Sequence, residues 1–444
     1  MATSFKKNRL AALIALGLAL HGGNAAALGL LDAYQAALQN DPQYRSAFYA
    51  GEAGKENRIL GRSNLLPNIS GSYSGSQARN TQTYNGGRPA ALDYISRSST
   101  VQLRQPVLNL DGWARYRQGA AQSDYAAAQF ESQQQEVIVR VVSAYVDVLF
   151  KGDLLQLAEV QRDTLVEQRK VNDRLFKGGE GTSTDMLETQ ARLDAAEAAV
   201  LEAQDALATS RTTLASVIGR DDPGTLDELS PDFRARPADN ISFEAWKNIA
   251  LERNPDIRTQ TANLEVAHQE VNKARAGHAP RVDFVATYGK TSSDSIQTIG
   301  QDVTVRSIGV QVNIPLYAGG AVNAQSRQAV ANQEKARADL QSQKDKVVLE
   351  LRKDYDALLS SGARIDALVK SVASSELLIK ATEKSVQGGV RINLDVLNAK
   401  QQLYVAKRDL AQARYNYLLN TLRMRAAVGT LSADDVREMA PYFH

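Results

Sequence analysis

Apolar residues recur at every seventh position in two stretches of the chain. In the first stretch, residues 183–218, they are Leu193, Val200, Leu207 and Leu214, and in the second they are Leu403, Leu410, Tyr417 and Met424. Small residues fill the second position of each repeat: Ala196 and Ala203, then Ala406 and Ala413. A heptad repeat is typical of helices that pair as coiled coils, and the alanines allow close approach. The pattern therefore predicts two coiled-coil helices.

A long proline-free stretch, residues 111–176, precedes the first heptad pattern. Gly119 and Gly152 are its only glycines after the opening turn, and apolar residues between Ile138 and Leu149 keep helical spacing. At about 1.5 Å per residue this helix would be roughly 100 Å long. The glycine-rich residues 177–182 predict a turn, so that the two helices form a hairpin. A free coiled-coil stalk would also explain the heptads, but it needs no strands.

Strand patterns occur ahead of each long helix. In residues 307–316 the apolar side chains alternate with polar ones: Ile308, Val310, Val312, Ile314 and Leu316. This period of two suits a wall between lipid and water. Residues 282–290 form a second predicted strand, in which the alternation is less regular. In the first copy, residues 69–77 place serines on one side of a strand, and residues 95–103 form the strand that returns beside it. We expect residues 78–94 and 291–301, which are polar, to be external loops. Ordinary hairpins on a soluble protein are the alternative.

The chain is an internal duplication. Pro42 and Pro67 recur as Pro255 and Pro280, each 213 positions later, and further matches keep an offset of 209 or 210. These matches include Tyr145 with Tyr355, Gly178-Gly179 with Gly388-Gly389, and Asp185 with Asp395. We expect a helix after each of Pro42 and Pro255, since proline suits the first helical turn. The predicted organisation is a first repeat over residues 28–219, an equatorial linker over 220–242, a second repeat over 243–429, and a C-terminal equatorial tail over 430–444.

The first 27 residues are predicted to be a secretory signal peptide. A basic start (Lys6, Lys7 and Arg9) is followed by a short apolar run and by Ala25-Ala26-Ala27. A membrane anchor is the alternative, but the run is too short to cross about 30 Å of hydrocarbon. Cleavage would change the formal net charge from +2 to −1, which gives no argument for nucleic acid as a partner. Without cysteine, a disulfide framework, a thiolate metal site and an acylated N-terminal cysteine are all excluded.

Membrane insertion would require several copies of the chain. After the signal no apolar run approaches 18 residues, so a membrane crossing would need a closed β-barrel, in which every backbone group is paired. About four strands per chain cannot enclose a pore and would leave unpaired edges. Three chains would supply about twelve strands, within the range of transmembrane barrels. The charged long helices would then extend through an aqueous compartment.

The doubled unit of strand pair and helix pair resembles the TolC family of outer-membrane exit ducts. The resemblance covers essentially the whole mature chain and is most specific in residues 395–397, 413–418 and 429–431. It implies an α+β membrane protein whose tandem repeat contributes four strands to a trimeric, 12-stranded transmembrane β-barrel. A long α-helical coiled-coil barrel would continue that barrel into the periplasm. It also implies a homotrimer in outer-membrane lipid that is recruited by a periplasmic membrane-fusion adaptor and an inner-membrane transporter.

The resemblance also implies a gate at the periplasmic tip. Arg391 resembles the family's gate arginine and Asp395 its first acidic-ring position, while Thr184 and Asp185 resemble the partners of that arginine and of a gate tyrosine. The chain departs from the family at two positions, because the second ring position is Asn398 and the tyrosine position is Val386. In a symmetric trimer three copies of Asp395 would surround one axis and attract cations. Solvated charges on a helix turn are the alternative.

The glycine turns at the helix tips, Gly178-Gly179 and Gly388-Gly389, are the expected docking points for an adaptor's helical hairpin. Simple turn chemistry would also account for them.

An enzyme is not expected, and neither is a cofactor. His268 and His278 are ten positions apart, unlike the one-turn pair of a metal-binding helix, and no phosphate loop or nucleophile elbow occurs. The predicted function is an outer-membrane exit duct that spans the periplasm. Its cargo would be proteins exported by an ABC transporter in a type I system. The alternatives are multidrug efflux with a proton-driven pump, and a periplasmic adaptor or stalk protein.

Overall fold

The computed structural model describes residues 27–83, 85–235, 241–293 and 300–444. These residues form two compact units. Unit 1 comprises the described residues within Met1–Ala47, Gln133–Asn254 and Val347–His444, and unit 2 those within Phe48–Ser132 and Pro255–Lys346. Residues 1–26 of the predicted signal peptide lie outside the described residues, as do 236–240 of the predicted linker and 294–299 of the second predicted loop.

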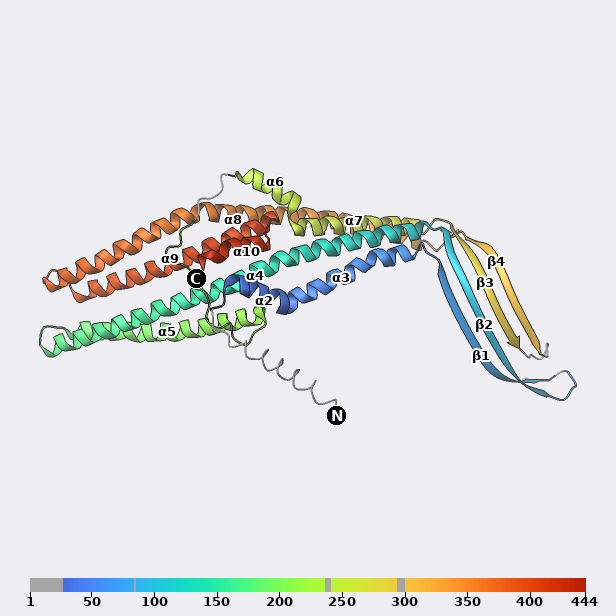
Figure 1. Ribbon diagram of the computed structural model, residues 1–444, viewed down its shortest axis with the longest axis horizontal. Coiled ribbons are helices and arrows are strands. Elements are labelled where there is room, and N and C mark those ends of the chain that lie inside the picture. Colours follow the sequence, from blue (N-terminus) through green and yellow to red (C-terminus); the bar gives the residue numbers. More distant parts are fainter. Residues whose placement is uncertain (1–26, 84, 236–240, 294–299) are drawn as a thin grey trace, which may run out of the picture. The chain divides into compact units, whose positions relative to one another are not determined.

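The same order of elements occurs twice along the chain (Figure 1). The first copy contains α2 (Leu30–Asn40), α3 (Pro42–Ser63), β1 (Asn68–Gln82), β2 (Ala90–Leu108), α4 (Leu110–Lys177) and α5 (Ser183–Ile218). The second contains α6 (Phe243–Arg253), α7 (Pro255–Ala276), β3 (Arg281–Ser293), β4 (Gln301–Asn313), α8 (Ala321–Gln387) and α9 (Asn393–Val428). Helix α10 (Ala433–Met439) and the short 3-10 helix η1 (Ala440–Tyr442) follow. The predicted tandem repeat is confirmed, including the helices that begin at Pro42 and Pro255. The exact domain boundaries remain predictions.

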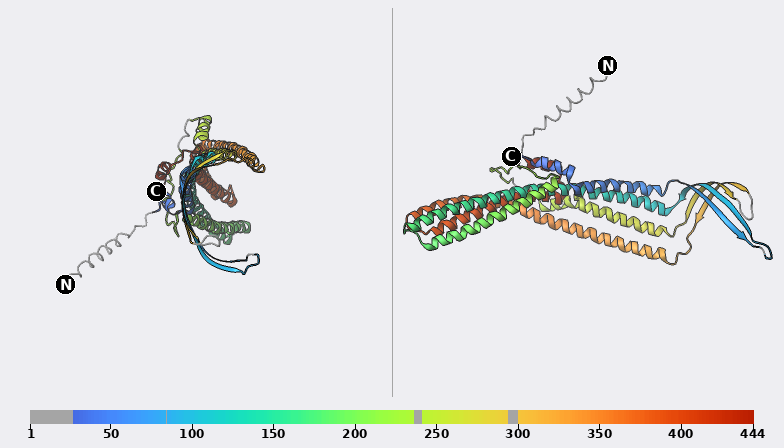
Figure 2. Two further views of the ribbon diagram at one scale, coloured as in Figure 1. Left: turned by 90° about the vertical axis from the view of Figure 1, so that its right-hand side faces the viewer. Right: turned by 90° about the horizontal axis from the view of Figure 1, so that it is seen from below.

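In the described part of unit 2 the strands form one four-stranded antiparallel sheet, in the order β1-β2-β3-β4. Figure 2 shows the strands side by side in a curved layer. Residue pairing places Ile69, Leu103, Ala286 and Ile308 in one row across the sheet, and Ser70, Gln102, Thr287 and Ser307 in the next. Because neighbouring rows point to opposite faces, one face is apolar and the other polar. The predicted alternation is thereby confirmed as far as Asn313, where β4 ends, whereas Ile314 and Leu316 lie beyond the strand, contrary to the prediction.

The strands are longer than the sequence predicts. Residues 78–94 were expected to form an external loop, but β1 continues to Gln82, which pairs with Ala90 of β2. The prediction was wrong there because polar side chains also pair across strands. Arg79 Nε donates to Asp93 Oδ1 at 2.7 Å, and Asn80 Nδ2 donates to the Tyr94 hydroxyl at 3.0 Å. These cross-strand pairs stabilise the ladder without an apolar row.

The core of unit 1 surrounds Tyr145 of α4, which is fully buried. Its hydroxyl donates to the carbonyls of Leu28 and Asp227, at 2.9 and 3.0 Å. Leu28 also forms a parallel bridge with Leu226, and Leu229 forms an antiparallel bridge with Phe443. The start of the described chain, the linker and the C-terminal tail are thus joined at one place. Among the described residues, no helix combines the length and apolar character that crossing a membrane requires.

Candidate gate at the helical hairpin tips

The two hairpin turns of unit 1 have the same backbone structure. Gly179 and Gly389 have φ values of +79° and +73°, a left-handed conformation that favours glycine. The amide of Glu180 donates to the Leu175 carbonyl at 2.9 Å, and that of Val390 donates to the Ser385 carbonyl at 2.9 Å. This pattern ends a helix in a Schellman motif. The predicted glycine turns are therefore confirmed as turns, and both tips lie at the same end of unit 1 (Figure 1).

The helices that leave the two turns begin differently. At α5 the Thr182 hydroxyl accepts a hydrogen bond from the Asp185 amide at 3.1 Å, whereas Ile392 gives α9 no side-chain cap. A capping side chain stabilises a helix end by about 0.5–2 kcal/mol. Val390 and Ile392 are also exposed, at 82 % and 61 %. The tip of the second repeat therefore has fewer stabilising contacts of its own than the tip of the first.

The predicted gate residues lie at these tips but are not joined to one another within one chain. The Arg391 side chain is exposed, and among the described residues it has no hydrogen-bond or ion-pair partner. Asp395 is partly buried in the first turn of α9, where a carboxylate favours the helix dipole. Thr184 is exposed in the first turn of α5, next to Asp185. A single chain therefore leaves Arg391 available to groups outside it.

Asn398, the second predicted ring position, does have a partner. Its Oδ1 accepts a hydrogen bond from Arg192 Nη2 of α5 at 2.9 Å. Arg192 also forms an ion pair with Glu188 at 3.0 Å. This contact joins the hairpin of the first repeat to α9 of the second. An amide at this position accepts the bond without adding a negative charge to the tip.

A second polar connection joins the two repeats, and it was not predicted from the sequence. Gln168 Nε2 donates to Asn393 Oδ1 at 2.7 Å, and Asn393 Nδ2 donates to Asn172 Oδ1 at 3.2 Å. Asn172 in turn donates to the Thr189 hydroxyl at 2.7 Å, where both side chains are buried. Thr189 lies seven positions before Ala196, in the alanine series of the heptads. A polar residue in such a series often fixes the register of paired helices. Thr189 at this position was therefore the one feature of the sequence from which the network could have been predicted.

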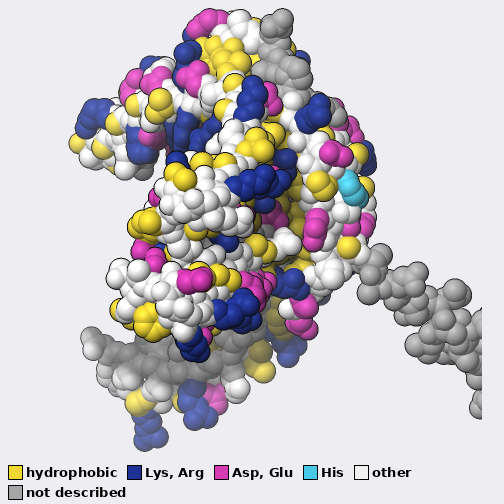
Figure 3. All heavy atoms as spheres, turned by 90° about the vertical axis from the view of Figure 1, so that its left-hand side faces the viewer, with side chains coloured by type: hydrophobic (Ala, Val, Ile, Leu, Met, Phe, Trp, Pro, Cys, Tyr) yellow, Lys and Arg dark blue, Asp and Glu magenta, His cyan; other side chains and the backbone are white. Residues whose placement is uncertain are grey.

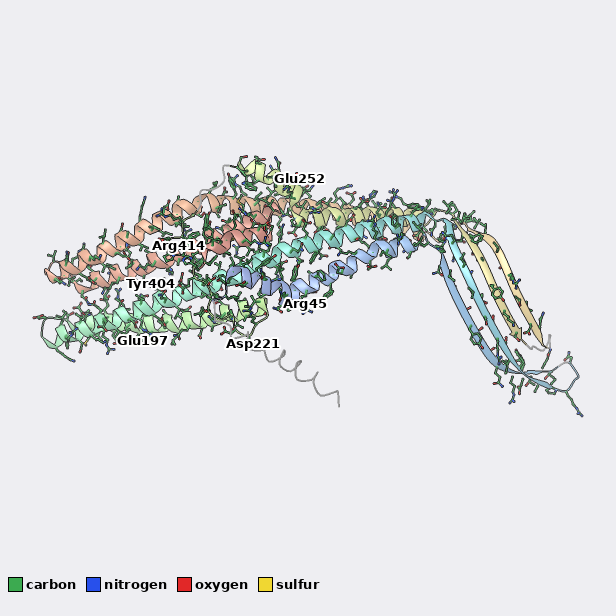
Figure 4. All side chains as sticks on the ribbon, in the orientation of Figure 1. Arg45, Glu197, Asp221, Glu252, Tyr404 and Arg414 are labelled. Carbon is green, nitrogen blue, oxygen red and sulfur yellow. The ribbon has the colours of Figure 1, made fainter. Side chains whose placement is uncertain are left out.

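An apolar hollow of about 480 Å³ lies between α4, α5, α8 and α9. Leu157, Leu165 and Leu397 contribute to its wall, together with Tyr404, which is labelled on α9 in Figure 4. Arg192, Lys400 and Lys407 form its polar part, and each is paired with a glutamate: Glu188, Glu383 and Glu376. Viewed from the tips, acidic, basic and hydrophobic side chains are interspersed (Figure 3). Two of these ion pairs join α9 to α8, so the hollow is part of a helix-packing interface.

A duplicated strand pair with a duplicated coiled-coil hairpin is the architecture of outer-membrane channel subunits. The solved structure of the Campylobacter jejuni CmeC outer membrane channel shares it, with a TM-score of 0.79 over 94 % of this chain and 90 % of that one, at 19 % identity. The family model described as outer membrane efflux protein matches residues 33–220 and 246–430. The chain belongs to this family, and its predicted resemblance to the TolC family is confirmed. The family's members are transport channels.

Two curated relatives are similar over nearly the whole chain. The "Proteases secretion protein PrtF" of Dickeya chrysanthemi is 36 % identical over 98 % of this chain and 95 % of its own length. The "Alkaline protease secretion protein AprF" of Pseudomonas aeruginosa is 39 % identical over 95 % of this chain and 88 % of its own. The chain is thus an outer-membrane export channel subunit, with its helical part in the periplasm.

Proposed function

We propose that this channel is the outer-membrane exit duct of a type I system that secretes proteins. The observation that carries the proposal is the similarity to two protease secretion proteins, at 39 % and 36 % identity over at least 95 % of the chain. Its partners would be an inner-membrane ABC transporter and a periplasmic membrane-fusion adaptor. The adaptor's hairpins would dock at the tips that contain Gly178, Gly179, Gly388 and Gly389. The chain would conduct cargo and catalyse no reaction.

We further propose that the working assembly is a homotrimer. The described sheet has two free edges, β1 and β4, and an apolar face on which Ile69 is 68 % and Ile308 78 % exposed. In lipid an unpaired strand edge is very unfavourable, because its backbone groups find no water. Three sheets joined edge to edge would pair every edge and form a 12-stranded barrel. The apolar face would then contact lipid, and the serine-rich face would line the pore.

The closed state of this trimer would be held at the tips. Arg391 has no partner in its own chain, so we assign it to a neighbouring subunit's tip, where Thr184 and Asp185 offer a hydroxyl and a carboxylate. The three copies of Asp395 would form an acidic ring at the constriction. Asn398 would contribute no charge to this ring, since it accepts a bond from Arg192.

Reconstituted secretion tests the proposed cargo. Cells that lack their own exit duct would express this chain with the ABC transporter and adaptor of a type I system, and with a protein substrate of that transporter. We expect the substrate in the medium only when all three components are present. Substrate that stays in the cell, combined with restored resistance to small toxic compounds when a proton-driven pump is supplied, would favour efflux instead.

A further inference from the structure

A groove in unit 2 has the composition of a lipid-headgroup site, and no part of the export function uses it. It lies between the beginning of α4 and the end of α7 and has a volume of about 450 Å³. Its lining residues are Leu110, Trp113, Ala114, Arg117, Gln269, Asn272, Arg275, Ala276 and Ala279. Leu110 follows the end of β2 by two positions, and Ala279 precedes β3 by two. The groove therefore lies where the helices meet the sheet.

The contact between α4 and α7 has two chemically different sides. On one side Gln118 Nε2 bonds to Glu270, and Lys273 Nζ lies 3.3 Å from Gln118 Oε1, so that the charges there are satisfied. On the groove side Trp113 and Leu110 are exposed, at 52 % and 50 %. Large apolar side chains exposed next to a sheet with an apolar face are typical of the membrane–water interface, where tryptophan is enriched. We therefore assign the groove side to the outer surface of the channel.

The groove also contains two cationic groups that are available to a ligand. Arg117 and Arg275 are both exposed, and neither guanidinium has a hydrogen-bond or ion-pair partner among the residues that the structure describes. A guanidinium forms two parallel hydrogen bonds with a phosphate and is less strongly hydrated than an ammonium group. Basic pockets beside apolar surface bind the headgroups of anionic lipids. Two unpaired arginines beside a tryptophan therefore favour an anionic lipid headgroup over a neutral one.

We propose that this groove binds an anionic phospholipid of the membrane leaflet that faces the helices. Arg117 and Arg275 would hold the phosphate, Trp113 would lie at the level of the glycerol, and Leu110 with Ala276 and Ala279 would contact the first acyl carbons. The proposal rests on the outer-membrane location of the channel and is independent of its cargo and gate. Each trimer would carry one such site per subunit, which would anchor the sheet at a fixed depth in the bilayer.

Tryptophan fluorescence tests this proposal on the purified full-length channel in detergent. The chain has two tryptophans, so the Trp246→Phe variant leaves Trp113 as the sole reporter. We expect short-chain phosphatidylglycerol to shift Trp113 emission in a saturable way, whereas phosphatidylcholine and inorganic phosphate produce no saturable shift. The double variant Arg117→Gln/Arg275→Gln should weaken the phosphatidylglycerol response by at least about tenfold, since it removes both charge-assisted contacts to the phosphate.

The matched control is Arg58→Gln. Arg58 is an exposed arginine on α3, ten positions before β1, and its side chain has no hydrogen-bond or ion-pair partner among the described residues. It should leave the phosphatidylglycerol response unchanged. Equal responses to the two lipids, or an unchanged response in the double variant, would overturn the proposal. A full response to inorganic phosphate would also overturn it and would indicate a site for free anions.

Discussion

Tyr145 and its counterpart in the second repeat, Tyr355, show how far one residue's role can diverge within a duplication. Tyr145 is buried and donates to the carbonyls of Leu28 and Asp227, whereas the Tyr355 hydroxyl donates to the exposed Ile241 carbonyl at a longer distance, 3.4 Å. The sequence pairs the two tyrosines by their offset but cannot distinguish them. The distinction arises because the start of the described chain, the linker and the ring of Phe443 all contact Tyr145, whereas Tyr355 is partly buried and meets the linker at Ile241.

We therefore expect Tyr145→Phe to lower the free energy of unfolding by about 1–3 kcal/mol, since it leaves buried carbonyls with fewer donors. Tyr355→Phe is the matched control and should cost less than about 0.5 kcal/mol. Thermal unfolding of the purified variants, followed by circular dichroism, measures both. Equal losses in the two variants would contradict the assigned role of Tyr145.

Asp153 of α4 is a partly buried carboxyl whose contacts predict a pH dependence of stability. The Tyr415 hydroxyl donates to its Oδ2 at 2.9 Å. Burial raises the pKa of Asp153, and Glu228 adds to the rise, while the Tyr415 bond and Arg414 oppose it. Between the ordinary pKa and the raised one the folded state binds more protons than the unfolded state. Stability from this group is therefore lost as the pH rises through the raised pKa.

The variant Asp153→Asn should lose this pH dependence of stability. Relative to the unchanged protein, its stability should be more favourable above the raised pKa than below it. Asp163→Asn, an exposed substitution ten positions further along α4, should leave the dependence intact. Denaturation midpoints measured from pH 4 to pH 8 compare the variants. A slope in Asp153→Asn as steep as in the unchanged protein would contradict the assignment.

The proposed gate can be tested by substitutions at Arg391 and Asp395. Arg391→Ser should raise the closed-state conductance, because it removes the link between neighbouring tips, and Asp395→Ala should reduce block by multivalent cations. Single-channel recordings in planar bilayers test both variants. Arg169→Ser and Asp366→Ala, exposed substitutions on α4 and α8, serve as controls and should change neither property. Unchanged conductance and unchanged block in the gate variants would count against the gate.

At the scale of elements, α4 shows what a sequence pattern determines and what it leaves open. The pattern predicts its length almost to the residue and identifies Gly119 and Gly152 as weakening positions. In the structure the two glycines differ. A Cβ on Gly119 would lie 2.3 Å from the Asn57 carbonyl oxygen of α3, whereas one on Gly152 would meet nothing within 4 Å. Gly119 is thus required by the close approach of α3, which residue type alone does not reveal.

We expect Gly119→Ala to destabilise the protein by about 1–3 kcal/mol, because α3 must move away from α4. Gly152→Ala, on the same helix, should stabilise it by roughly 0.5–1 kcal/mol, since alanine favours the helical backbone. Chemical denaturation of both variants gives the comparison. A destabilising effect of the same size in both variants would show that helix propensity, and not packing against α3, governs Gly119.

In the other elements too, the sequence pattern predicts some features, whereas others depend on contacts that the pattern does not reveal. Periodicity predicted the coiled-coil helices and the faces of the strands, because burial of apolar side chains imposes a repeat of seven or of two. It failed for residues 78–82 and 90–94, where polar pairs such as Arg79 with Asp93 continue the ladder. The network of Gln168, Asn172 and Asn393 depends on contacts between distant segments. Only the position of Thr189 in the alanine series indicated it from the sequence.

At the scale of the whole molecule, a single chain is incomplete. The described sheet of unit 2 has two free edges, its apolar face is exposed, and Arg391 of unit 1 has no partner in the described chain. The sequence predicted this incompleteness from the strand number. The gate contacts could not be derived from one chain, because in the proposed trimer the groups that bind Arg391 come from another subunit.

The central claim is that copies of this chain pool their strands in the outer membrane, and the mass of the extracted protein tests it most directly. Outer membranes would be solubilised in mild detergent, and light scattering after size-exclusion chromatography would give the protein mass without the detergent. We expect light scattering to give the mass of three mature chains. We also expect the trimer to resist heating in detergent and to run as a trimer-sized band on electrophoresis. A single chain recovered from the periplasmic extract without detergent would contradict the claim.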